Sequence, residues 1–231
     1  MDNGWDGSIL AIFIIDSLSL GLANLSLNQS TLRANAITCV RGERTLFAAL
    51  DLHITAGEWL HIRGENGIGK TSLLRLLAGL AKPVSGEIYW NDQSIAEAAS
   101  EYHRNILFLG HRDSLKEDLT ALENLSIATA LDGVNVSEED IFRALHRFGL
   151  RGREDLPVHC LSAGQKRRVL LARLLLRKAT LWILDEPFNA LDVGAVEMLS
   201  KLIGEHIAAG GMAILTSHQE IPMPNGRVVQ L

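Results

Sequence analysis

The pattern of apolar and polar positions changes character near residue 31. Beyond it, short apolar runs bounded by turn residues predict strands over residues 32–39, 44–54, 58–63, 87–90, 106–109, 181–184, 212–216 and 227–231. Apolar positions at helical spacing predict helices from residue 70 to about 80, through much of residues 120–150, and over 162–178 and 193–207. Strands that alternate with helices predict an α/β fold with a helical insertion near the middle.

The first thirty residues form a different region. Residues 9–27 are apolar and close to the minimum length of a membrane span, but Asp16 lies near their middle, at a cost of roughly 2.5–3.5 kcal/mol for insertion. Residues 1–8 contain Asp2 and Asp6 and no Lys or Arg, which disfavours a secretory signal. We interpret residues 1–30 as an N-terminal extension of uncertain role, with a membrane anchor as the alternative.

Composition and charge exclude some classes of function. The formal net charge of −5 disfavours a dedicated nucleic-acid binder. Basic residues between 166 and 178 are therefore interpreted as a solvated helix face, with nucleic-acid contact as the alternative. Cys39 and Cys160 lack metal or redox spacing, so we expect two buried thiols in a reducing compartment.

A complete phosphate-binding loop of the form GxxxxGK[ST] follows the strand predicted over residues 58–63 and opens the next helix. Backbone N–H groups of such a loop surround phosphate oxygens, and the helix N-terminus adds a partial positive charge. Lys70 is expected to reach the β- and γ-phosphates of ATP, and the Thr71 hydroxyl to bind Mg²⁺. The predicted ATP-binding residues of this segment are Gly64, Glu65, Asn66, Gly67, Ile68, Gly69, Lys70, Thr71 and Ser72.

An acidic pair ends the apolar strand predicted over residues 181–184. The carboxyl edge of a parallel sheet is where open α/β sheets bind ligands. Asp185 is the expected partner of Mg²⁺, and Glu186 is the candidate general base for the attacking water. Strands that end in a single Asp are common, so the prediction depends on the adjacent Glu186 and Pro187 and on the downstream Asp192.

A third motif, Leu161-Ser-Ala-Gly-Gln165, opens the basic helix and resembles the ABC ATPase signature, usually LSGGQ. The resemblance covers nearly all of residues 31–231. It implies a P-loop NTPase with a RecA-like core, an antiparallel β subdomain and a helical signature subdomain at about residues 112–160. It also implies a head-to-tail homodimer that holds two ATP molecules, in which signature residues of one copy contact ATP on the other. These residues are Ser162, Ala163, Gly164 and Gln165.

Two further site residues come from the resemblance. Asp192 belongs to the segment that the family calls the D-loop, and His218 matches its γ-phosphate-sensing histidine. By position alone, an isolated histidine at the end of a strand is more often structural.

Several phrases together resemble the ATP-binding subunit of the bacterial cytochrome c maturation (haem exporter) system. They are RTLF from Arg44, LGH from Leu109, LTALEN from Leu119, LSAGQKRRVLLARLLL from Leu161 and LWILDEPFNALD from Leu181. That resemblance implies an ATPase at the cytoplasmic face of the inner membrane, a polytopic membrane permease as partner, and haem as the proposed cargo. The alternatives are a soluble ABC ATPase of a cytosolic assembly, such as iron–sulfur scaffolding, and a binding module without hydrolysis, which Lys70, Asp185 and Glu186 disfavour.

Two positions depart from the ABC pattern. The family places a Mg²⁺-contacting Gln where this chain has His111 and Arg112, and either residue can occupy that position. The aromatic residue that stacks on adenine is replaced by Arg41. An arginine can also stack on a base, so we list Arg41 among the ATP-binding residues, with an ordinary surface arginine as the alternative.

Overall fold

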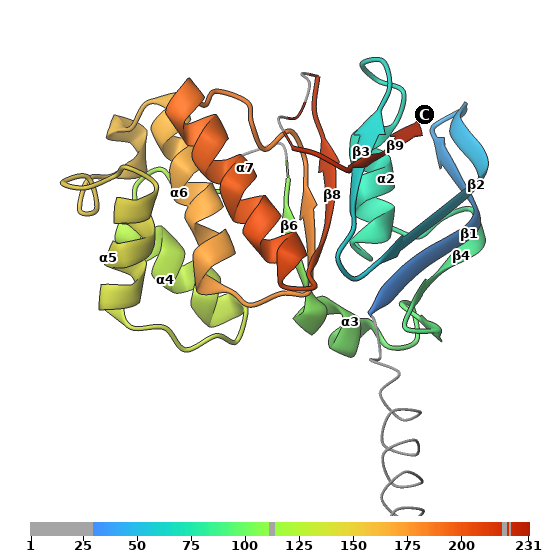
Figure 1. Cartoon of the computed structure of the whole chain (residues 1–231), viewed down its shortest axis with the longest axis horizontal. Coiled ribbons are helices and arrows are strands. Elements are labelled where there is room, and N and C mark those ends of the chain that lie inside the picture. Colours follow the sequence, from blue (N-terminus) through green and yellow to red (C-terminus); the bar gives the residue numbers. More distant parts are fainter. Residues whose placement is uncertain (1–29, 111–113, 219–220, 222) are drawn as a thin grey trace, which may run out of the picture.

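The computed structural model describes residues 30–110, 114–218, 221 and 223–231 (Figure 1). The elements in chain order are β1 (Thr31–Arg41), β2 (Arg44–Thr55), β3 (Trp59–Arg63), α2 (Lys70–Leu77), β4 (Ser85–Trp90), β5 (Gln93–Ser94), α3 (Ala99–Asn105), β6 (Ile106–Leu109), α4 (Ala121–Leu131), α5 (Glu138–Arg147), η1 (Val158–Cys160), α6 (Ala163–Leu176), β7 (Leu181–Leu184), α7 (Val193–Ala208), β8 (Met212–Thr216) and β9 (Arg227–Gln230). The predicted α/β alternation is confirmed.

A five-stranded parallel sheet forms the centre, in the order β6-β7-β8-β3-β9. Side chains alternate across a strand, so Ile183 and Ile214 face one apolar cluster, which includes α2, and Trp182 and Ala213 face the other, which includes α4 to α7. Every residue of β7 and of β8 is buried, as expected for strands covered on both faces. The carboxyl ends of these strands therefore emerge together from a rigid core.

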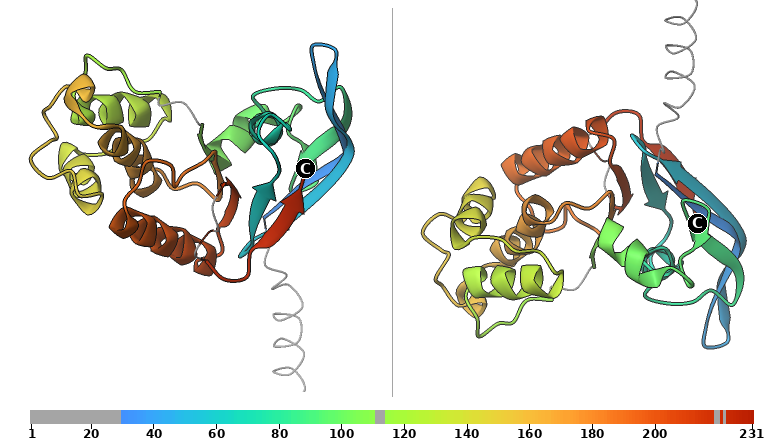
Figure 2. Two further views of the ribbon diagram at one scale, coloured as in Figure 1. Left: turned by 90° about the horizontal axis from the view of Figure 1, so that it is seen from above. Right: turned by 90° about the horizontal axis from the view of Figure 1, so that it is seen from below.

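An antiparallel sheet, in the order β2-β1-β4-β5, forms a curved layer on one side of the molecule (Figure 2). Helix α2 lies between the two sheets, because its leucines share an apolar cluster with residues of both β1 and β3. Strands β4 and β5 form a hairpin, in which Asn91 and Asp92 have φ angles of 49° and 66°. Positive φ at both central residues is typical of the tight turn that joins antiparallel strands.

Helices α4, α5 and α6 gather on the opposite side of the molecule (Figures 1 and 2). A capping box begins α5, since Ser137 and Asp140 exchange side-chain and backbone hydrogen bonds. Helix α2 ends at Leu77, before the predicted end at about residue 80. Gly79, two residues after the helix, has a φ of 69°. In the part of the chain that the structure describes, no helix has the length and apolarity needed to cross a membrane.

Two expectations are wrong. The basic side chains of α6 do not form a solvated face: Arg167 is buried, while Arg173 and Arg177 pair with Asp132 at 2.9 and 2.8 Å. A helical period separates apolar from polar positions, but it does not reveal which basic positions meet acidic or carbonyl groups of other elements. The cysteines are also not both buried, because Cys160 is exposed and Cys39 is half-buried.

Candidate active site

The phosphate-binding loop joins β3 to α2 and depends on glycine. Gly64 and Gly69 have φ angles of 154° and 124°. A Cβ on Gly64 would lie 2.8 Å from Ile68 Cγ2, and one on Gly69 would lie 3.1 Å from Leu46 Cβ. No side chain caps the N-terminus of α2, so its first N–H groups remain for an anion.

Lys70, the first residue of α2, lies folded over this loop. Its side chain is largely buried, and Nζ donates to the carbonyl oxygens of Gly64 at 2.7 Å and Glu65 at 3.3 Å. These two hydrogen bonds place the ammonium group at the loop.

Asp185 lies at the carboxyl end of β7 and links two neighbouring elements. Its Oδ2 accepts from the Thr71 hydroxyl of α2 at 2.7 Å, and its Oδ1 accepts from the Thr216 hydroxyl of β8 at 2.7 Å. The Thr216 oxygen also accepts from the backbone N–H of Glu186 at 2.8 Å. A buried carboxylate is thereby fully hydrogen-bonded beside the loop. The prediction from sequence missed Thr216, which carries no motif of its own.

Glu186 is 5 % exposed, and neither of its carboxylate oxygens makes a hydrogen bond in the described part of the chain. The Nε2 atom of His218 lies 3.3 Å from Oε1, within ion-pair distance but without hydrogen-bond geometry. Glu186 also has a φ of 51°, which costs a non-glycine residue about 1–3 kcal/mol. Buried carboxylate oxygens without hydrogen bonds and a strained backbone are both typical of functional residues.

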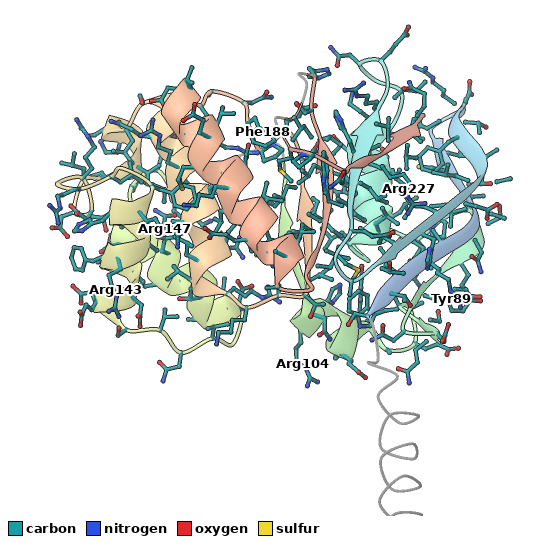
Figure 3. All side chains as sticks on the ribbon, viewed as in Figure 1. Tyr89, Arg104, Arg143, Arg147, Phe188 and Arg227 are labelled. Carbon is teal, nitrogen blue, oxygen red and sulfur yellow. The ribbon has the colours of Figure 1, made fainter. Side chains whose placement is uncertain are left out.

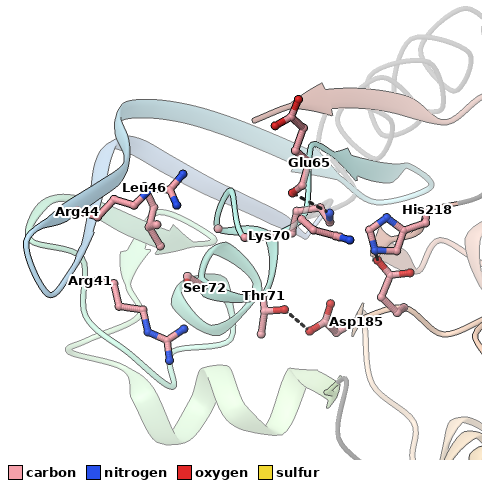
Figure 4. Close-up of a pocket in the computed structure, with 13 residues that line it drawn as sticks. Arg41, Arg44, Leu46, Glu65, Lys70, Thr71, Ser72, Asp185 and His218 are labelled. Atoms are coloured by element: carbon pink, nitrogen blue, oxygen red, sulfur yellow. Dashed lines mark hydrogen bonds and ion pairs between the residues drawn. The ribbon is translucent and has the colours of Figure 1, made fainter.

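These groups meet in one cavity of about 560 Å³ (Figure 4). Of the predicted site residues, those that line it are Arg41, Glu65, Asn66, Gly67, Gly69, Lys70, Thr71, Ser72, Asp185, Glu186 and His218. Gly64 and Ile68 belong to the loop but do not line the cavity. Arg44 and Leu46, which line it from the β1–β2 hairpin, were missed. Their closeness to Arg41 in the sequence was the available signal.

The signature residues lie elsewhere. Among the described residues that line the cavity, none belongs to the segment from Ser162 to Gln165. Ser162 caps α6: its Oγ accepts from the Gln165 N–H at 3.3 Å, and the Gln165 side chain accepts from the Ser162 N–H at 2.9 Å. Ala163 is exposed on the first turn, and Gly164 packs so closely that an added Cβ would lie 2.6 Å from the Ala190 carbonyl.

Asp192 caps α7, since its Oδ1 accepts from the Ala195 N–H at 2.9 Å. It also pairs with Arg168 of α6. The Ala195 N–H and the Arg168 guanidinium lower the pKa of the Asp192 carboxyl. The signature helix and the segment after β7 are therefore in direct contact within one copy. His111 and Arg112 lie outside the described residues.

Comparisons with known proteins identify the family of the chain. Residues 47–189 match the ABC transporter family. The chain is 51 % identical over 200 residues to the cytochrome c biogenesis ATP-binding export protein of Dechloromonas aromatica, covering 87 % of this chain and 98 % of that protein. It is 47 % identical to the protein of the same name from Haemophilus influenzae, over 84 % of this chain and 92 % of that protein.

Solved structures give the same fold. The cbiO1 subunit of an ABC transporter complex from Clostridium perfringens has a TM-score of 0.66 at 27 % identity, covering 83 % of this chain and 80 % of that one. A dimeric bacterial ABC transporter cassette has a TM-score of 0.77 at 24 % identity, over 87 % of this chain and 94 % of that one. The predicted fold class is confirmed. The chain belongs to the ABC transporter family of ATPases and, within it, to the cytochrome c biogenesis ATP-binding export proteins.

Proposed function

We propose that this chain binds Mg²⁺-ATP between two copies of itself and hydrolyses it to energise an inner-membrane exporter for c-type cytochrome biogenesis. One observation carries the proposal: Lys70, Asp185 and Glu186 converge on a single cavity beside the uncapped start of a helix. A cation, a ligand set for a metal and a carboxylate base are the groups that phosphoryl transfer to water requires.

The phosphates of ATP occupy the glycine loop. Backbone N–H groups at the start of α2 and the Lys70 ammonium neutralise the β- and γ-phosphates. The Lys70 ammonium donates to two loop carbonyls. When phosphate binds, charged phosphate oxygens replace these carbonyls as acceptors and form stronger hydrogen bonds with the ammonium group.

Thr71 and Asp185 are suited to hold Mg²⁺. The Thr71 hydroxyl and an Asp185 carboxylate oxygen lie 2.7 Å apart at the edge of the cavity, and Mg²⁺ takes oxygen ligands from hydroxyl, carboxylate and phosphate groups. When bound, Mg²⁺ neutralises charge on the β- and γ-phosphate oxygens.

Glu186 accepts a proton from the attacking water. Its carboxylate makes no hydrogen bond within the described residues and lines the cavity, and the backbone hydrogen bond to Thr216 holds the residue in place. His218, exposed at the cavity rim beside Glu186, contacts the γ-phosphate and reports its presence.

A second copy completes each site. The Ser162 end of α6 does not line the cavity in the described part of one chain, and a helix N-terminus with a serine hydroxyl is a ready anion site. A head-to-tail homodimer brings Ser162 and Gly164 of one copy to the ATP on the other.

The transport partner is a polytopic permease, and the chain associates with it at the cytoplasmic face of the inner membrane. The names of the relatives, cytochrome c biogenesis ATP-binding export proteins, support this assignment. Haem is the cargo that we propose. Fractionation tests the partner: the chain should sediment with membranes only when the permease is co-expressed.

The site is tested with Glu186→Gln. The variant keeps the shape of the side chain but removes the base, so kcat should fall by roughly a hundredfold or more while ATP still binds. An ATP-bound dimer should therefore accumulate in sizing experiments. The matched control is Glu139→Gln on the exposed surface of α5. A Glu186→Gln variant that stays monomeric at saturating ATP contradicts the dimer, and one that hydrolyses ATP normally contradicts the role of Glu186.

A further inference from the structure

A buried arginine lies behind the active site. Arg167, in the second turn of α6, is only 4 % exposed. By contrast, the surface arginines Arg143 and Arg147 on α5 lie at the outside of the helical region (Figure 3). A buried guanidinium is costly unless its N–H groups are hydrogen-bonded, so the partners of Arg167 indicate what it does.

Four of its partners among the described residues are backbone carbonyls at the carboxyl edge of the parallel sheet. Nη2 donates to the carbonyl oxygens of Asp185 at 2.8 Å and Glu186 at 2.9 Å. Nε and Nη1 donate to the carbonyls of Pro187 at 3.4 Å and Gly110 at 3.2 Å. One side chain thus joins α6 to the ends of β6 and β7.

The backbone of Glu186 is held from both sides. Its N–H donates to the Thr216 hydroxyl, and its carbonyl accepts from Arg167. Its φ of 51° is a strained conformation, and such conformations persist only where surrounding contacts enforce them. The carboxylate itself makes no hydrogen bond, so its direction depends on this backbone.

Arginine is suited to this task. Its guanidinium presents five N–H donors in a rigid planar fork and no acceptor, so one group can serve several neighbouring carbonyls. A lysine at the same place keeps the charge but has a single ammonium on a flexible stem, and it cannot reproduce the planar array.

We propose that Arg167 is a positioning residue for hydrolysis, which aims the Glu186 carboxylate by fixing the strained backbone at residues 185–187. Arg167 does not line the cavity and acts through Glu186. Helix α6 begins at the signature, which in the proposed dimer contacts the ATP bound to the other copy. Arg167 therefore links that contact to Glu186, the base for the ATP bound to its own copy. The inference rests on the proposed function.

The test compares Arg167→Lys with Arg173→Lys. Arg173 lies on the same helix and pairs with Asp132 away from the cavity that holds Glu186. Arg167→Lys should lower kcat by roughly ten- to a hundredfold, the scale expected for misplacing a reacting group by about 1 Å, while KM for ATP changes less than about twofold. Arg173→Lys should lower the melting temperature and leave kcat unchanged. Rates are expressed per ATP-dependent dimer, so loss of folded protein does not count as loss of kcat.

A double variant supplies the decisive readout. Because Arg167 acts through Glu186, adding Arg167→Lys to Glu186→Gln should lower the residual rate no further. An independent further loss, or an Arg167→Lys variant with a lower melting temperature but normal kcat, overturns the inference. If the wild type itself neither hydrolyses ATP nor dimerises, the proposed function fails instead.

Discussion

The two ends of the nucleotide cavity are built differently. At the phosphate end, Lys70, Thr71 and Asp185 already make hydrogen bonds to neighbouring groups. At the hairpin end, Arg41 and Arg44 are exposed, and their side chains make no hydrogen bond or ion pair within the described residues. The phosphate end is therefore ordered by contacts within the protein, whereas the hairpin end presents two exposed cations without a described protein partner. We expect affinity to depend mainly on the first end.

The strongest test of this difference is Lys70→Ala. The change removes the cation that neutralises the β- and γ-phosphates, and hydrogen bonds to charged groups contribute about 1.5–3 kcal/mol each. ATP affinity should fall by roughly a hundredfold or more, measured by calorimetry. Lys201→Ala, on the exposed surface of α7, is the control. Unchanged ATP affinity in Lys70→Ala would contradict the assignment of residues 64–71 as the phosphate-binding loop.

A second test weakens the bonds behind the phosphate end. Thr216→Val keeps the shape of the side chain but leaves Asp185 Oδ1 and the Glu186 N–H without their partner. Buried groups left in this way cost about 1–3 kcal/mol, so the free energy of unfolding should fall by that amount and kcat should fall with it.

The control is Thr129→Val in α4. Thr129 is equally buried, and its hydroxyl donates to the Leu125 carbonyl of the same helix at 2.9 Å. Its loss should reduce stability by less than about 1 kcal/mol, because helical carbonyls already accept a backbone bond. Equal effects on kcat in the two variants would show that the Thr216 bonds have no special role.

A smaller effect is expected at the hairpin. If Arg41 stacks on adenine, Arg41→Ala should weaken ATP binding by about two- to thirtyfold, because cation–π contacts contribute roughly 0.5–2 kcal/mol. Arg41→Tyr should restore binding. Arg44→Ala is the comparison: if it matches Arg41→Ala and tyrosine does not restore affinity, the hairpin supplies only positive charge. Equal ATP affinity in the wild type and in Arg41→Ala would show that Arg41 is an ordinary surface arginine that does not contact adenine.

The smallest effect is expected from removing residues 1–30. Of these, the structure describes Ser30, whose carbonyl accepts from the Ala56 N–H at 3.0 Å and which does not line the cavity. The truncated chain should keep its ATPase rate within about twofold. Loss of membrane association in the presence of the permease would support the anchor interpretation.

The sequence predicts the residues that line the phosphate end better than it predicts the residues that support them from behind. Lys70 and Thr71 lie in one short loop whose geometry is local, and Asp185 and Glu186 end an apolar strand, so spacing alone places them at one sheet edge. Thr216 and Arg167 act through contacts between elements distant in sequence. The periodicity of a sequence does not reveal such contacts, and the basic residues of α6 had led us to predict a solvated helix face.

The cap at the start of α6 has a kinetic consequence. Ser162 and Gln165 are locked in reciprocal hydrogen bonds, so the rotamer entropy of this turn is lost during folding rather than on encounter with a second copy. The Ser162 oxygen accepts in the cap, which leaves its hydroxyl hydrogen to donate. This turn then needs no ordering on association, and we expect association at an ordinary rate of about 10⁵–10⁷ M⁻¹s⁻¹. The nucleotide would act mainly on how long the two copies stay together.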